Sequence, residues 1–146
     1  MHTAFSRHFP AALNYLIAIR QFVQEAAAAL DADPAAISDL LLAVDEAATN
    51  VIVHGYRGRP GEIEIEVGRE ESALVVRLRD QAAPFDPTTV PLPDLTRPLE
   101  ERAPGGLGIY LMKQAVDKVT HRVTPQGGNE LTLVKRGGRC ENLDDN

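Results

Sequence analysis

The sequence predicts an α+β fold, a two-layer α/β sandwich in which helices cover one face of a mostly antiparallel sheet. Apolar residues recur with a helical period up to about position 55 and then alternate with charged residues from 62 to 80. A glycine-rich helix and two more strand-like segments follow. Because helices and hairpins succeed one another in this order, the strands are expected to pair mainly as antiparallel neighbours.

The composition is that of a globular protein. The chain has 146 residues, of which 44% are hydrophobic and 25% charged, and this fits one domain over residues 1–136. Residues 137–146 are expected to form a disordered tail. No segment is apolar enough to span a membrane and no signal peptide is evident, so we expect a cytoplasmic protein. The net charge of −6 argues against direct nucleic-acid binding.

Two amphipathic helices are expected after a short amino-terminal edge strand. Residues 10–30 carry one apolar stripe, and the polar, proline-containing segment 31–34 ends that helix. Residues 37–52 carry a second apolar stripe, which stops at the glycines of segment 55–61. Both stripes are wide enough to face a core, so both helices are expected to lie on the sheet.

The sheet is predicted from two alternating segments, "EIEIEV" at 62–67 and "ALVVRLRD" at 73–80, joined by a polar turn at 68–72. As a hairpin they set glutamates opposite arginines. Residues 81–104 contain six prolines and no period, which indicates a long loop of the kind that forms lids or binding loops. A helix opens at "GGLG", and strands are expected near 118–124 and 130–135.

The second helix carries polar residues that its apolar pattern does not explain. Glu46, Asn50 and His54 are spaced i, i+4 and i+8 and share one stripe, whereas Asp45 is turned about 100° away. A solvated helix edge is the simplest interpretation of any one of them. Together, an amide oxygen that can hold Mg²⁺ and a carboxylate one turn away that can orient a nucleophile suggest a catalytic site.

Two further elements fit a nucleotide site. Asp80 ends the second strand of the hairpin, where a carboxylate can accept a hydrogen bond from an exocyclic amine such as that of adenine. The glycine-rich turn at 105–108 opens a helix, and such a turn can cradle phosphate with its backbone amides. Each element alone is weak, and the turn is not a Walker loop. An Mg-binding amide, an amine-reading carboxylate and a phosphate-cradling turn together are the parts of an ATP site.

With these motifs the sequence resembles the GHKL (Bergerat-fold) ATPase superfamily, and within it the anti-sigma-factor serine/threonine kinases of bacteria. "DEAATNVIVHGY" resembles the N box of that family, "RDQAAPFDP" its first glycine box, and "GGLGIYLMKQAVDKV" its second. The similarity covers residues 9–135. It implies ATP and Mg²⁺ as ligands, and it makes residues 81–104 an ATP lid.

The resemblance also assigns roles to residues. It makes Glu46 the general base, Asn50 the magnesium ligand and Asp80 the partner of the adenine amine. The residues that it places along the bound nucleotide are Gly105, Gly106, Leu107, Gly108 and Thr132. One position departs from the family pattern, because Ala82 stands where the first glycine box usually has glycine and backbone comes close to the base.

The function implied is a protein kinase that phosphorylates a STAS-type anti-sigma-factor antagonist and otherwise sequesters a sigma factor. The resemblance also suggests a homodimer. The alternative is a nucleotide-regulated or nucleotide-free module that binds a signalling partner without catalysis. Ala82 favours this alternative, whereas Glu46 and Asn50 favour the kinase.

Overall fold

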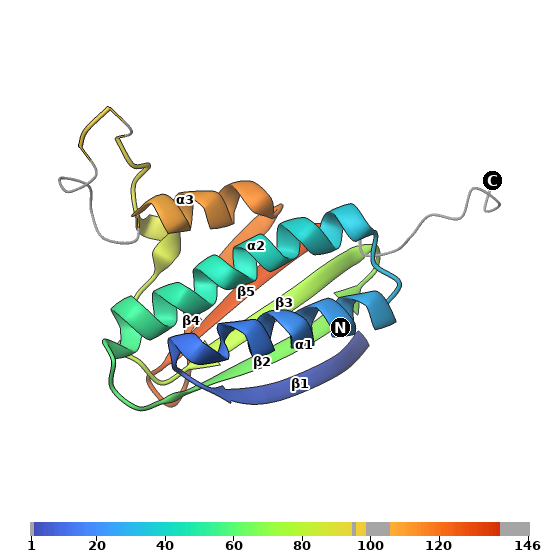
Figure 1. Cartoon of the computed structure of the whole chain (residues 1–146), viewed down its shortest axis with the longest axis horizontal. Coiled ribbons are helices and arrows are strands. Elements are labelled where there is room, and N and C mark those ends of the chain that lie inside the picture. The colour runs from blue at the N-terminus through green and yellow to red at the C-terminus, as the bar shows by residue number, and fades with distance from the viewer. Residues whose placement is uncertain (1, 95, 99–105, 138–146) are drawn as a thin grey trace.

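The computed structural model describes residues 2–94, 96–98 and 106–137, and it confirms the two-layer α+β sandwich (Figure 1). The strands are β1 (His2–Pro10), β2 (Glu62–Glu70), β3 (Ala73–Asp80), β4 (Lys118–Val123) and β5 (Asn129–Arg136). The α-helices are α1 (Leu16–Ala29), α2 (Pro34–Asn50) and α3 (Gly106–Ala115). Shorter pieces are the 3₁₀ helices η1 (Leu13–Tyr15) and η3 (Pro87–Thr89) and the π-helix η2 (Val51–Tyr56).

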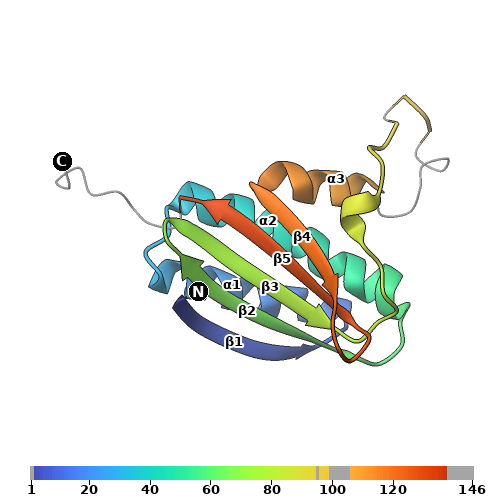
Figure 2. The same cartoon turned by 180° about the vertical axis from the view of Figure 1, so that it is seen from behind.

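The five strands form one antiparallel sheet in the order β1-β2-β3-β5-β4. Helices α1, α2 and α3 lie side by side on one face of it, with α2 in the middle (Figure 1), and the view from behind shows the other face bare (Figure 2). Within the described parts of the chain, no helix is both long and apolar enough to cross a membrane.

The structure moves two of the expected boundaries. Pro10 does not open the first helix but ends β1, where it pairs with Glu62, and helical structure begins only at Leu13. The turn between β2 and β3 is shorter than expected, because the ladder continues to the pair Glu70–Ala73. Of the expected disordered tail only Gly137 is described, and residues 138–146 lie outside the described residues.

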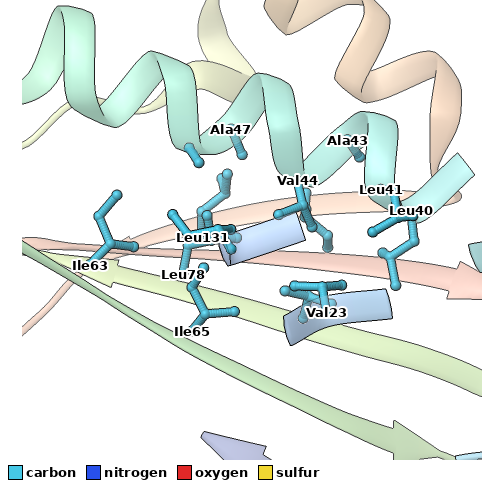
Figure 3. Packing of buried hydrophobic residues seen from close by; sticks show 14 of the residues in the cluster. Val23, Leu40, Leu41, Ala43, Val44, Ala47, Ile63, Ile65, Leu78 and Leu131 are labelled. Carbon is cyan, nitrogen blue, oxygen red and sulfur yellow. The ribbon is translucent and has the colours of Figure 1, made fainter. Parts of the chain in front are cut away.

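Helix α2 is the central element of the core. Pro34 occupies its first turn, and the side chain of Asp33 caps it by accepting a hydrogen bond from the Ala35 N–H. Its buried stripe lies over side chains of the sheet and of α1 (Figure 3). Much of that stripe is alanine, which lets α2 approach its neighbours closely. The core residues labelled in Figure 3 are Val23, Leu40, Leu41, Ala43, Val44, Ala47, Ile63, Ile65, Leu78 and Leu131.

The bare face of the sheet carries a charge network that crosses all five strands. His8 of β1 lies 3.3 Å from Glu64, which accepts a hydrogen bond from Arg79 at 2.9 Å. Arg79 also donates from Nε to Glu130 at 2.7 Å, and Glu130 accepts a further bond from Arg122 of β4 at 2.8 Å. The expected glutamate–arginine pairing between β2 and β3 is therefore present and extends into β4 and β5.

Glu130 is the most enclosed member of this network, with 7% of its surface exposed. Hydrogen bonds from Arg122 and Arg79 lower the pKa of its carboxyl from 4.5 to about 2, although its partial burial acts in the opposite direction. A carboxylate whose pKa falls on folding stabilises the native state above its unfolded pKa. That contribution is lost as the pH falls through the folded pKa.

We therefore expect Glu130→Gln to lower the free energy of unfolding by about 1–2 kcal/mol at pH 7, because neutral bonds to the arginines are weaker than charged ones. The difference from wild type should shrink between about pH 4.5 and pH 2, as the wild-type carboxyl gains its proton. Urea unfolding across that range measures it. Glu62→Gln, at an exposed carboxylate 3.9 Å from His8, is the matched control and should change stability little. A pH-independent difference for Glu130→Gln would contradict the assigned role.

Candidate functional site

A cavity of about 500 Å³ opens beside the carboxy-terminal half of α2. Four of the polar residues singled out from the sequence line it together: Glu46, Asn50, His54 and Asp80. Helix α3, strands β4 and β5 and the loop after β3 supply the rest of the wall, which is largely apolar. The apolar part of the lining includes Ala47, Val51, Ala82, Ala83, Pro84, Phe85, Pro87, Ile109, Met112 and Leu131.

The polar stripe of α2 faces this cavity because the opposite stripe of the helix is in the core. Glu46 and Asn50 lie in its last two turns, and His54 follows in the π-helix η2, which continues α2 with a wider turn. Single π-turns at helix ends are frequent at functional sites. Asp45 points elsewhere, as its spacing predicts, and forms an ion pair with Arg20 of α1. Asp45 therefore joins two helices and does not line the cavity.

Helix α3 touches Glu46 through a glycine. A Cβ added at Gly108 would overlap Oε2 of Glu46, so the absence of a side chain there admits the carboxylate. This contact brings the second glycine box against the N box, as the resemblance implies. Gly106, Leu107 and Gly108 form the first turn of α3 but are not among the described lining residues. Gly105, also expected at the site, lies outside the described residues.

Asp80 is a buried carboxylate at the end of β3, with 4% of its surface exposed. Its Oδ1 accepts hydrogen bonds from the Ala82 N–H at 2.9 Å and from Nδ2 of Asn129 at 3.0 Å. Burial raises the pKa of this carboxyl, and the two donors act against that rise. No described residue donates to Oδ2, so this oxygen is the one that Asp80 can offer to a ligand in the cavity.

Asn129 is a lining residue that the sequence analysis did not find. It faces Asp80 across the β3–β5 ladder, and its Nδ2 also lies 3.3 and 3.2 Å from the carbonyl oxygens of Ala82 and Ala83. Its Oδ1 accepts from the Phe85 N–H at 2.9 Å and lies 2.7 Å from Nε2 of His121. The Asn129 amide is thus hydrogen-bonded to the loop after β3 and to the Asp80 carboxylate, and it contacts His121 of β4.

Thr132 does not reach this cavity. It follows Asn129 by three residues on β5, and strand residues an odd number apart point to opposite faces. Its cross-strand neighbour is Arg77, whose side chain lies in the charge network of the bare face. The structure therefore places Asn129, not Thr132, beside Asp80. The signal that could have located it is the turn "PQGGN", which sets where β5 begins.

The alanine that replaces the glycine of the first glycine box is accommodated by a glycine on the opposite wall. A Cβ added at Gly55 would lie 3.2 Å from Cβ of Ala82, closer than ordinary van der Waals contact. Gly55 and Ala82 both line the cavity, so one methyl group occupies space that two would overfill. The methyl group of Ala82 is therefore part of the wall of a cavity that remains open.

Tyr56 connects the carboxy-terminal end of η2, which continues α2, to the sheet. Its hydroxyl donates to the Glu62 carbonyl at 2.8 Å and accepts from the Gln81 N–H at 2.8 Å, next to Asp80. Its ring fills the space that a side chain at Gly61 would need. Burial raises the pKa of the Tyr56 hydroxyl, which keeps it a donor at neutral pH. The hydroxyl of Tyr56 therefore connects the helical wall that carries Asn50 with the strand end that carries Asp80.

The first part of the expected lid is anchored to the domain. Asp86 caps the helix η3 by accepting from the Thr88 N–H at 2.8 Å, and Lys113 of α3 donates to the Thr88 carbonyl at 3.0 Å. Beyond Val90 the described segment runs away from the helices (Figure 1), and Leu92 is 74% exposed. The beginning of the expected lid, 81–104, thus forms part of the cavity wall and is hydrogen-bonded to α3, and residues 95 and 99–104 lie outside the described part.

The cavity suits a purine nucleotide. Its volume is in the range of ligand pockets, it is mainly apolar, and it offers a buried acceptor at Asp80. Asn50 supplies a hard amide oxygen of the kind that Mg²⁺ prefers, and Mg²⁺ usually takes only one or two protein ligands beside the phosphates. Glu46 lies one helical turn away and supplies a carboxylate that can accept a proton. Among the described residues, no group of three or more His, Cys, Asp or Glu side chains is arranged so that it could hold a metal ion by itself.

Comparison with known proteins agrees with this geometry. The family model of the histidine kinase-like ATPase domain matches residues 9–135. A solved structure, of the RsbU and RsbW domains of Rv1364c from Mycobacterium tuberculosis, superimposes with a TM-score of 0.59 over 91% of this chain and 32% of that one. Its sequence identity is 17%, so it supports the fold alone.

Two curated relatives are protein kinases. The serine/threonine-protein kinase BtrW of Bordetella bronchiseptica is 32% identical over 96 residues, which cover 65% of this chain and 67% of BtrW. The serine-protein kinase RsbW of Bacillus cereus is 33% identical over 87 residues, 57% of this chain and 54% of RsbW. The chain thus spans about half the length of RsbW. Together the family model and these relatives show that the chain belongs to the histidine kinase-like ATPase domain family, within the GHKL anti-sigma kinases.

Proposed function

We propose that the protein is an ATP-dependent serine/threonine kinase that phosphorylates an anti-sigma-factor antagonist of the STAS type and otherwise sequesters a sigma factor. The observation that carries the proposal is the single cavity in which Asp80 and the pair Glu46 and Asn50 meet. An acceptor for the adenine base, an oxygen ligand for a metal and a carboxylate that can act as general base therefore face the same space. The kinase names of BtrW and RsbW support the reaction class.

Each residue has a chemical role in this proposal. Oδ2 of Asp80 accepts a hydrogen bond from the adenine amine, and the apolar wall around Met112 and Leu131 packs on the base. Asn50 holds Mg²⁺, which when bound neutralises charge on the phosphates. Glu46 accepts the proton of the attacking Ser or Thr hydroxyl. The amino-terminal turn of α3 provides backbone N–H groups for phosphate oxygens.

The second candidate is a partner-binding module that does not transfer phosphate. Ala82 favoured it in the sequence, because a methyl group there narrows the first glycine box. The contact between Ala82 and Gly55 weakens this argument, since the glycine on η2 makes room for that methyl group. The two candidates differ in one measurable quantity, which is the appearance of phosphorylated antagonist.

Titration of Mg-ATP into the purified protein by calorimetry tests the site first. We expect binding by the wild type, and at least about a tenfold loss in Asp80→Asn, because the new amide nitrogen or the loss of charge weakens the bond to the amine. Asn50→Ala should remove the Mg²⁺ dependence of binding. Asp86→Asn, at a carboxylate that only caps η3, is the matched control. Wild-type protein that binds no ATP at millimolar concentration would leave the partner-binding module as the function.

Gly108→Ala tests the contact between the glycine box and Glu46. The added methyl group would displace the Glu46 carboxylate, whose flexible side chain can turn away without unfolding the domain. We expect phosphoryl transfer to an antagonist to fall about tenfold or more, with the melting temperature nearly unchanged. Glu46→Gln should show the same loss of transfer while ATP binding persists. Equal transfer rates in Gly108→Ala and wild type would contradict the role given to Glu46.

A further inference from the structure

Asp80 is held in one orientation by two neighbours that use the same oxygen. The Ala82 N–H and the Asn129 amide both donate to Oδ1, at 2.9 and 3.0 Å. Of these only Asn129 is a side chain, and it comes from a different strand, 49 residues away along the chain. Its own amide orientation is not free, because Oδ1 of Asn129 accepts from the Phe85 N–H. The donor end of Asn129 must therefore face Asp80.

We propose that Asn129 is a positioning residue for the base subsite: by holding Oδ1 of Asp80 it leaves Oδ2 as a fixed acceptor, which selects a purine that carries an amino group. This inference rests on the proposed ATP site and adds the residue that sets its selectivity. An ionised carboxylate only accepts hydrogen bonds, whereas a protonated carboxyl could also donate one to a 6-oxo purine. Asn129 opposes protonation of Asp80, because its amide donates to Oδ1 and so favours the ionised form.

The surroundings of Asp80 make the influence of Asn129 on its protonation important. The carboxyl is buried beside apolar side chains, and burial raises its pKa. The charged or titratable groups that face it are His121 from β4, Tyr56 from η2, and the cavity residues Glu46, His54, Arg57 and Arg59. Asn129 is the only side chain among the described residues that donates a hydrogen bond to it. Without the Asn129 donor, the rise that burial causes in the pKa of Asp80 is less strongly opposed.

Two nearly isosteric variants are expected to shift the pH dependence in opposite directions. In Asn129→Leu the donor is lost, so Asp80 gains its proton at a higher pH than in the wild type, and ATP affinity falls as the pH is lowered through that midpoint. In Asn129→Asp a second carboxylate stands at the same place. The pair shares one proton at low pH and repels when that proton leaves, so ATP affinity falls as the pH is raised. Both variants should bind about tenfold or more weakly than wild type at their unfavourable pH.

The experiment combines two measurements on the full chain. The first is a ¹³C NMR titration of the Asp80 side-chain carboxyl in nucleotide-free protein, assigned with Asp80→Asn. The second is calorimetric binding of ATP and ITP at pH values below and above the Asp80 midpoint found by NMR. We expect the Asp80 midpoint to rise in Asn129→Leu and the ratio of ATP to ITP affinity to fall. His121→Gln, which removes the imidazole next to Asn129, should leave ATP affinity with the same direction of pH dependence as in the wild type.

The outcomes separate this inference from the proposed function. Wild type that binds ATP, together with variants that lose affinity equally at every pH and keep the wild-type Asp80 midpoint, would overturn the positioning role and leave the ATP site standing. Wild type that binds no ATP would overturn the ATP site and the selectivity with it. A raised midpoint in Asn129→Leu together with opposite pH trends would support the proposal. Circular dichroism confirms that each variant is folded before it is compared.

Discussion

The position of α2 is the constraint on which the site depends. This helix is buried between α1, α3 and the sheet, and its alanines let the three neighbours approach it closely. Ala43, Val44 and Ala47 are buried in the core, so α2 cannot rotate about its axis. The polar stripe on the adjacent face of the helix therefore keeps its direction. Glu46 and Asn50 therefore reach the cavity from a rigid element. A site supported in this way keeps its geometry more precisely than one on loops.

Periodicity predicted what depends on local sequence. The stripes of α1 and α2, the β2–β3 hairpin and the end of β3 at Asp80 all follow from the spacing of apolar residues. The helix start was predicted too early, because Pro10 suits a first helical turn as well as a strand end. Asn129 could not be found in this way, since its contacts with Asp80 and Phe85 join segments more than forty residues apart. Thr132 was expected at the site because a motif match does not say which face of a strand a residue occupies.

Ala82 shows why a motif departure must be judged in three dimensions. Read along the sequence, an alanine in a glycine box argues for a damaged site. In the structure the methyl group lies against Gly55, which comes from the end of the N-box helix. The two cavity walls that carry Gly55 and Ala82 can lie this close only if one of the two residues lacks a side chain, and either residue can be the glycine. The methyl group of Ala82 is accommodated, and the Asp80 carboxylate still lines the cavity.

The bare face of the sheet and the cavity depend on the same strand register. Arg79 pairs with Glu130 across the β3–β5 ladder, and the next pair along is Asp80 with Asn129. These pairs point to opposite faces, so an ion pair outside and a carboxylate–amide pair inside are fixed by one alignment. A slip of one residue would bury the arginine and break both pairs together. The charge network therefore does more than cover the sheet, because it holds the alignment that puts a donor beside the buried carboxylate.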